Sequence, residues 1–389
     1  MKNAVIVSAV RTPVGRLGGS LSGFRPEVLG GMIVREAVNR AKIDPEIIEE
    51  LIFCSCENAD LKCAARVVGL ESGLPLHIPA YQIQRGCASS LTALWDGALM
   101  IKAGYADTIV AGGVESTSLA PYNMDRPKRA FEMAPMKWST PVFSPPSFGN
   151  FPNGLTAEEI ASRFGISREE CDEFALESHR KGALAYQGGY FDDQLLTVEV
   201  PLKGGKSALF NRDEPLRDDS TMESLAKLTP SFVKNGVCTA GNSSPLTDGA
   251  SCAVIMEQEK AEALGLDILA VFKDFADAGC EPKIMGEGPV HAVRKLLKKT
   301  GLTLDDIDLI ELNEAFAAQS IHCVRSLEID PEKLNVNGGA IALGHPFAAT
   351  GVILVAKMVY ELRRRNLKRG IVTFCIGGGM GVAALFERP

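Results

Sequence analysis

Two cysteines, a histidine and an asparagine stand in contexts that suit nucleophilic and acid–base catalysis. Cys87 lies within residues 84–91 (QRGCASSL), where a short apolar run turns into a helix. Unpaired N–H groups and the helix dipole at such a position stabilise a thiolate and lower its pKa. Cys87 is therefore a candidate nucleophile. The alternative is a small buried side chain, because free cysteines are often buried.

His345, one of only five histidines, ends a glycine-rich stretch at residues 338–346 (GGAIALGHP). Its position between glycine and proline predicts a turn that aims the ring, as a general base requires. A purely structural histidine is the alternative.

Cys375 opens a second glycine-rich stretch, residues 375–381 (CIGGGMG), and Asn313 opens NEAFA directly after an expected strand. Glycines let backbone N–H groups approach a ligand closely, as an oxyanion hole requires, although they also mark tight turns between strands. Asn313 either orients a water molecule or caps the helix that follows it.

Strands and helices alternate around these residues, which predicts an α/β protein with a mainly parallel sheet. We expect strands at residues 2–9, 51–54, 78–83 and 106–113. Helices are expected at residues 26–41, 64–72 and from 89 to about 103.

The last third of the chain repeats this order, with residues 301–312 similar to 43–54 and a strand expected at 333–338. Residues 350–363 and 369–378 then match the helix and the strand that follow Cys87. The repeat predicts two α/β units that face each other, so that their reactive loops meet. We divide the chain into a first half (1–117 plus about 251–268), an inserted loop domain (118–250) and a second half (269–389).

The inserted region begins with residues 121–153, which hold seven of the 21 prolines together with Met133, Met136 and several aromatic residues. Prolines prevent regular structure here, and we expect this segment to cover a site or contact another subunit. Residues 167–170 read as a capping box, and residues 212–227 as an exposed charged segment.

Composition narrows the class of protein. The 389 residues carry a net charge of −7, which gives no support for nucleic-acid binding. The N-terminus lacks the pattern of a secretory signal, and no apolar run approaches the ~18 residues of a membrane span. Ten scattered cysteines favour free thiols in a reducing cytoplasm, and the spacing of Cys54, Cys56 and Cys63 is a weak match to a metal site.

Over essentially its whole length the chain resembles the thiolase family. The matching motifs are CASSL at 87–91, GGVES at 112–116, AGNSS at 240–244 with DGA at 248–250, NEAFA at 313–317, GHP at 344–346 and CIGGGMG at 375–381. The resemblance implies duplicated thiolase-like α/β units packed in layers, with an inserted loop domain.

The resemblance also implies Claisen condensation, or the reverse thiolysis, of coenzyme A thioesters through an acyl-enzyme. Cys87 would be the nucleophile, His345 its base and Cys375 the second acid/base. Asn313 would hold a water that binds one thioester oxygen together with His345, and the N–H groups of Cys87 and Gly377 would form the other oxyanion hole.

For coenzyme A, the resemblance places Ser244 and Phe232 along the pantetheine and adenine path, and Ala315 and Phe316 on the floor near the thioester. It implies no permanently bound cofactor and no metal, with acyl-CoA and CoA as small-molecule partners. A cytoplasmic homodimer or homotetramer is expected.

Four departures from the family pattern bear on the acyl chain. Ser90 replaces a glycine, Ala348 replaces a glycine after the histidine, Pro245 follows Ser244, and Pro152-Asn153 precedes Gly154. The alternatives are decarboxylative condensation, as in ketoacyl synthases, and a non-catalytic acyl-CoA or lipid carrier whose pocket Ser90 and Ala348 crowd.

Overall fold

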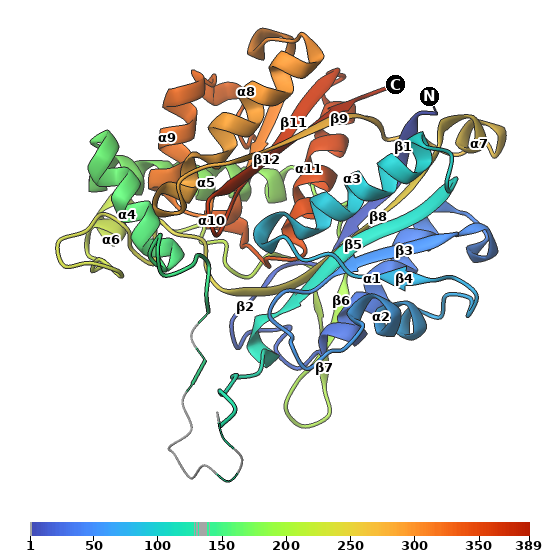
Figure 1. Ribbon diagram of the computed structural model, residues 1–389, viewed down its shortest axis with the longest axis horizontal. Helices are drawn as coiled ribbons and strands as arrows, with labels where there is room; N and C mark the ends of the chain where they lie inside the picture. Colours follow the sequence, from blue (N-terminus) through green and yellow to red (C-terminus); the bar gives the residue numbers. More distant parts are fainter. Residues whose placement is uncertain (1, 128, 130, 132–137, 140) are drawn as a thin grey trace.

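One large sheet runs through the whole molecule (Figure 1). The computed structural model describes residues 2–127, 129, 131, 138–139 and 141–389. Within them the strand order is β10-β11-β12-β9-β1-β8-β5-β3-β4, with β2 beside β8. The bounds are β1 (Ala4–Arg11), β2 (Gly15–Arg16), β3 (Glu50–Cys54), β4 (Ala80–Tyr81), β5 (Thr108–Ser116), β8 (Thr247–Glu257), β9 (Ala270–Gly279), β10 (Leu309–Leu312), β11 (Arg369–Ile376) and β12 (Met380–Glu387).

The sheet is mixed, so the prediction of a mainly parallel sheet is wrong. Parallel pairs occur between β3 and β4, β3 and β5, and β10 and β11, which lie toward the two ends of the sheet. The five pairs that β1, β5, β8, β9, β11 and β12 form through the middle, together with β2 on β8, are antiparallel. The α/β class itself is confirmed.

Helices cover both faces of the sheet and also lie between its two halves. The first unit carries α1 (Pro26–Ala41) and α2 (Ala64–Ser72), and the second carries α8 (Gly288–Thr300) and α9 (Ala317–Leu327). Between the halves lie α3 (Ser89–Lys102) and α11 (Thr350–Arg364), which pack on each other. The molecule is therefore layered, with its catalytic-type loops at the ends of the two central helices.

Strand β1 shows why both faces are covered. Ala4 and Ile6 belong to the core that α3 and α11 share, while Val5 and Val7 belong to the core under α1. Successive side chains of a strand point to opposite faces, so a strand that is apolar at every position needs a partner layer on each side.

The expected strand at 333–338 is reduced to a single parallel bridge between Ile310 and Leu334. Asn335 has a φ of 41° and turns the chain away from an extended path. Its side chain takes over the pairing instead: Oδ1 accepts the N–H of Leu312 and Nδ2 donates to the carbonyl of Leu312, each at 2.9 Å.

Regular secondary structure resumes in the inserted region after the proline-rich segment. Within that segment, Met133 and Met136 lie outside the described residues. It contains α4 (Asn153–Phe164), α5 (Arg168–Gln187), β6 (Val198–Pro201), β7 (Ser207–Phe210) and α6 (Met222–Ala226). Residues 121–127 and 138–139 extend away from the layers (Figure 1), whereas Phe143 has returned to them and lies beside Gly377. Short α7 (Gln258–Ala263) and α10 (Ala340–Leu343) complete the described helices.

Two predictions for this region have clear outcomes. The capping box of Ser167 and Glu170 is present at the start of α5. The segment 212–227, expected to be exposed, instead contains the fully buried Asp213, which pairs with Arg11 of β1 at 2.7 Å. A buried carboxylate needs such a partner, so this pair fastens the inserted region to the first unit.

Candidate active site

Cys87 lies in a 3₁₀ turn, Gly86–Ala88, that leads directly into α3. Gly86 has a φ of 52°, and the Ser89 hydroxyl holds the turn by accepting the N–H of Arg85 and donating to the carbonyl of Gly86. Cys87 is 9% exposed, and the nearby backbone N–H groups of Cys87 itself and of Gly377 act to lower the pKa of its thiol. The two halves of the chain therefore meet at this atom.

Burial raises the pKa of the Cys87 thiol to about 12. The two N–H groups lower the pKa, as the helix-end argument predicts, but removal of the thiolate from water has the larger effect. The prediction of a lowered pKa is therefore wrong for the unliganded protein. A thiol of this kind needs a base that removes its proton during the reaction.

His345 is buried and its ring is held from both sides. Nδ1 lies 2.7 Å from the Thr350 hydroxyl, whose own hydrogen is donated to the carbonyl of Pro346 at 2.8 Å. Because that hydrogen is already used, the Nδ1 of His345 carries the proton and Nε2 presents a lone pair. Burial lowers the pKa of His345 to about 3, so the ring is neutral and able to accept a proton.

Asn313 follows β10, and its Nδ2 lies 3.3 Å from Nε2 of His345. Its Oδ1 is buried and has no hydrogen-bond partner among the described residues. The capping alternative is wrong, because α9 begins at Ala317 with Phe316 at its N-cap position. A buried amide oxygen without a partner is suited to hold a water molecule or a ligand group.

Cys375 lies near the end of β11, and Gly377 follows in the turn into β12. Gly378 and Gly379 have φ values of 94° and 88°, which only glycine adopts readily. The buried Cys375 packs against Met285, Ala315 and Phe316. Burial and then the neighbouring Cys87 raise the pKa of the Cys375 thiol well above its ordinary value.

The four residues expected along the coenzyme A path lie together. The Ser244 hydroxyl donates to the carbonyl of Ala315 at 3.1 Å. The rings of Phe232 and Phe316 meet edge to face with centroids 5.9 Å apart, and Phe232 is 40% exposed. This group connects the buried thiols with the surface of the inserted region.

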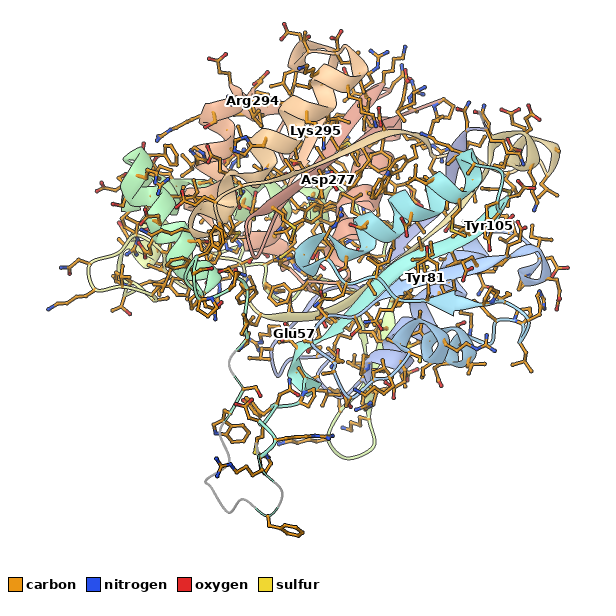
Figure 2. The ribbon with its side chains drawn as sticks, viewed as in Figure 1. Glu57, Tyr81, Tyr105, Asp277, Arg294 and Lys295 are labelled. Carbon is orange, nitrogen blue, oxygen red and sulfur yellow. The ribbon has the colours of Figure 1, made fainter. Side chains whose placement is uncertain are left out.

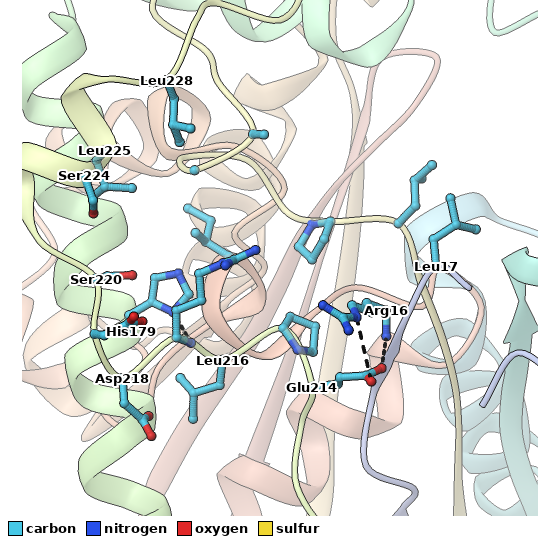
Figure 3. Close-up of a pocket in the computed structure, with 18 residues that line it drawn as sticks. Arg16, Leu17, His179, Glu214, Leu216, Asp218, Ser220, Ser224, Leu225 and Leu228 are labelled. Carbon is cyan, nitrogen blue, oxygen red and sulfur yellow. Dashed lines mark hydrogen bonds and ion pairs between the residues drawn. The ribbon is translucent and has the colours of Figure 1, made fainter. Parts of the chain in front are cut away.

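A cavity of about 960 Å³ adjoins this path at Pro245 (Figure 3). Arg16 and Arg217 bring positive charge to its lining, while Leu225, Leu228 and Ala240 bring apolar surface. His179 in the same wall accepts the backbone N–H of Arg217 at 3.2 Å, and burial lowers its pKa to about 4. Glu214, Asp218 and Asp219 also line the cavity, and Glu214 pairs with Arg16. A ligand therefore meets charges of both signs and an apolar wall.

The serine that replaces the family glycine does not face the acyl group. Ser90 is fully buried, and its Oγ accepts the N–H of Val352 at 3.2 Å. It fastens α3 to α11, so the prediction that Ser90 crowds the pocket is wrong. Ala348 is also buried and belongs to the core that contains Cys87.

Glu115 and Thr350 support the site although the sequence reading assigned them no role. The Glu115 carboxylate accepts the N–H groups of Cys56, Glu57 and Ala348 at 2.9–3.2 Å and so joins loops of the two halves. Figure 2 shows Glu57 where this loop lies close to the end of β5. The sequence offered a signal for each of these supporting roles. Glu115 lies inside the GGVES motif, and Thr350 follows His345 by five residues.

Among the residues with described positions, no group of three histidine, cysteine or acidic side chains is arranged to hold a metal ion. Cys54 is buried, Cys56 partly buried and Cys63 exposed, and all three are free. No helix within the described residues combines the length and apolar character needed to cross a membrane.

Comparison with known proteins gives consistent matches over the full chain. The model of the thiolase N-terminal domain matches residues 4–259, and that of the thiolase C-terminal domain matches residues 266–388. A 3-ketoacyl-CoA thiolase of Bacillus subtilis is 44% identical, and an acetyl-CoA acetyltransferase of Pseudomonas aeruginosa is 42% identical, each alignment covering 100% of both chains.

Solved structures of known proteins are also similar to this chain over its full length. Human mitochondrial 3-ketoacyl-CoA thiolase superposes with a TM-score of 0.95 at 38% identity, covering 100% of this chain and 99% of that one. A structure of the same human enzyme in complex with CoA gives a TM-score of 0.94 at 37% identity, covering 100% and 98%.

Proposed function

The chain belongs to the thiolase family, and on this premise we propose that it interconverts 3-ketoacyl-CoA and acetyl-CoA plus a shortened acyl-CoA through an acyl group on Cys87. The observation that carries the proposal is that backbone N–H groups from both halves of the chain, those of Cys87 and Gly377, stabilise charge at the buried sulfur of Cys87. A buried thiol placed in this way is suited to form and hold a thioester.

In thiolysis, Nε2 of His345 takes the Cys87 proton as the sulfur attacks the ketone carbon. The C2–C3 bond then breaks, its electron pair forms the enolate of acetyl-CoA, and Cys375 protonates that enolate. Coenzyme A next gives its thiol proton to the Cys375 thiolate and attacks the acyl group. Cys87 leaves and regains its proton from His345, so both thiols end as they began.

Each half-reaction places negative charge on an oxygen, and two sets of donors suit the two positions. The N–H groups of Cys87 and Gly377 would hold the oxygen of the acyl group on Cys87. Asn313, through a bound water, and His345 would hold the thioester oxygen of the acetyl unit. A good donor of this kind contributes roughly 3–4 kcal/mol to the transition state.

The cavity beside Pro245 is the proposed site of the nucleotide part of coenzyme A. Arg217 suits its phosphates, and Leu225 and Leu228 suit the adenine ring. Ser244, Phe232, Ala315 and Phe316 would then guide pantetheine toward Cys87. No permanently bound cofactor is needed in this scheme.

A burst assay separates the proposed roles of the two thiols. Wild-type protein mixed with acetyl-CoA should release one equivalent of CoA per subunit and carry an acetyl group on Cys87 by mass spectrometry. Cys87→Ala should abolish the burst. Cys375→Ala should keep the burst but lose carbon–carbon bond formation and cleavage.

Two further measurements test the alternatives. Product from a malonyl donor with none from acetyl-CoA would replace the proposal by decarboxylative condensation. Acyl-CoA binding in calorimetry without an adduct on Cys87 would replace it by a carrier function.

We also propose that the protein is a homodimer or homotetramer of the cytoplasm. The proposal of subunit contacts is supported by exposed Tyr122, Trp138 and Val142 in the proline-rich segment, because such apolar surface favours association. Light scattering of the intact protein would determine the number of subunits.

A further inference from the structure

One polar atom beside the proposed oxyanion donors has no role in the mechanism above. The Oδ1 atom of Asn153 is buried and accepts no hydrogen bond from any described residue. It lies 3.2 Å from where a Cβ on Gly377 would stand, and the N–H of Gly377 is one of the two that act to lower the pKa of the Cys87 thiol. Standard bond lengths place this oxygen within roughly 10 Å of the sulfur.

The surroundings of Asn153 connect this atom with the substrate path. Asn153 is the first residue of α4, and the next residue, Gly154, packs so closely on Phe232 that an added Cβ would lie 2.2 Å from the ring. On the other side, the ring of Phe143 lies 3.0 Å from the same Cβ position on Gly377. Asn153 thus lies next to Gly377 and, through Gly154, next to the proposed pantetheine path, with the ring of Phe143 beside it.

An acceptor left unpaired in such a place costs free energy unless a ligand supplies a donor. We propose that Asn153 is a specificity-determining residue that selects short acyl chains ending in a hydrogen-bond donor, such as a carboxamide or a hydroxyl, over plain alkyl chains. This inference rests on the proposed function, since it concerns the acyl group that Cys87 would carry.

The physical basis is that apolar sites and hydrogen-bonding sites differ in how strongly they discriminate between substrates. A pocket built from apolar atoms discriminates weakly against a small polar group, whereas a site that offers a hydrogen bond rejects a substrate unable to make it. An alkyl chain would leave Oδ1 buried and unpaired in the complex, but a carboxamide would donate to it.

The test uses two isosteric thioesters, 5-carbamoyl-3-ketopentanoyl-CoA and 6-methyl-3-ketoheptanoyl-CoA, which differ only in a terminal carboxamide or isopropyl group. For the wild type, kcat/KM for thiolysis should be at least about tenfold higher for the carboxamide. Asn153→Leu keeps the size of the side chain but removes the acceptor, and should bring the ratio to one or below. Asn153→Asp keeps an acceptor and should retain the preference for the carboxamide.

A wild-type ratio near one, or activity on acetoacetyl-CoA with none on either thioester, would overturn the inference. So would an equal rise in KM for both substrates in Asn153→Leu, because that result assigns the donor to an amide of pantetheine. The proposed function is tested separately by the acetyl-CoA burst of the wild type: loss of that burst removes the function, whereas an intact burst with an unselective ratio removes only this inference.

Discussion

Removal of the buried amine of Lys357 should be among the most damaging single changes in α11. Its Nζ lies 2.6 Å from Oε2 of Glu311 and 2.5 Å from the carbonyl of Gly338, and the two side chains are 1% and 3% exposed. Glu311 precedes Asn313 by two residues, and Gly338 begins the loop that ends at His345. Lys357→Met keeps the aliphatic length but leaves the Glu311 carboxylate buried without its cation.

Breaking a buried ion pair from one side costs about 3–5 kcal/mol. Burial raises the pKa of Glu311, and Lys357 lowers it. Without the amine, the folded protein holds a proton on Glu311 at pH values where the unfolded chain does not. The loss in Lys357→Met should therefore be smallest in acid and grow as pH rises through the pKa of the folded variant.

Equilibrium urea denaturation followed by circular dichroism measures this loss. Arg363→Met is the matched control, because Arg363 lies on the same helix and pairs with Asp267, but the two side chains are 44% and 67% exposed. Its cost should stay below about 1 kcal/mol. Adding Glu311→Gln to Lys357→Met should recover about 2 kcal/mol. Equal losses in the two single variants, or no recovery in the double variant, would refute the reasoning.

Three further changes have distinct outcomes. Burial raises the pKa of Glu115 to about 7, so relative to Glu115→Gln the wild type should lose up to about 3 kcal/mol of unfolding free energy between pH 4.5 and 7, as measured by urea titrations at several pH values. Ser90→Gly should cost about 1 kcal/mol by removing the bond from Val352, while leaving relative thiolysis rates across chain lengths unchanged. Thr350→Val should lower the rate of Cys87 acylation about tenfold by freeing the His345 ring, with KM for acetyl-CoA nearly constant in stopped-flow assays.

The inserted region shows where local signals are sufficient. The capping box at Ser167 is correct because a serine and a glutamate three residues later satisfy each other's backbone groups without outside help. The same local reasoning wrongly predicts that Asp213 is exposed. Its neighbours in the sequence are charged, but its burial depends on an ion pair with Arg11, which is distant in the sequence and absent from any local pattern.

The local order of elements was determined by the sequence itself: helices at 26–41 and 64–72, the turn into a helix at Cys87, and glycine turns before His345 and after Cys375. These depend on spacing, proline and glycine, whose effects extend only over a few residues. Strand direction, the side-chain pairing by Asn335 and the raised pKa of Cys87 were decided by tertiary structure. They depend on which distant segments exclude water from a group, and so do the unpaired oxygens of Asn153 and Asn313.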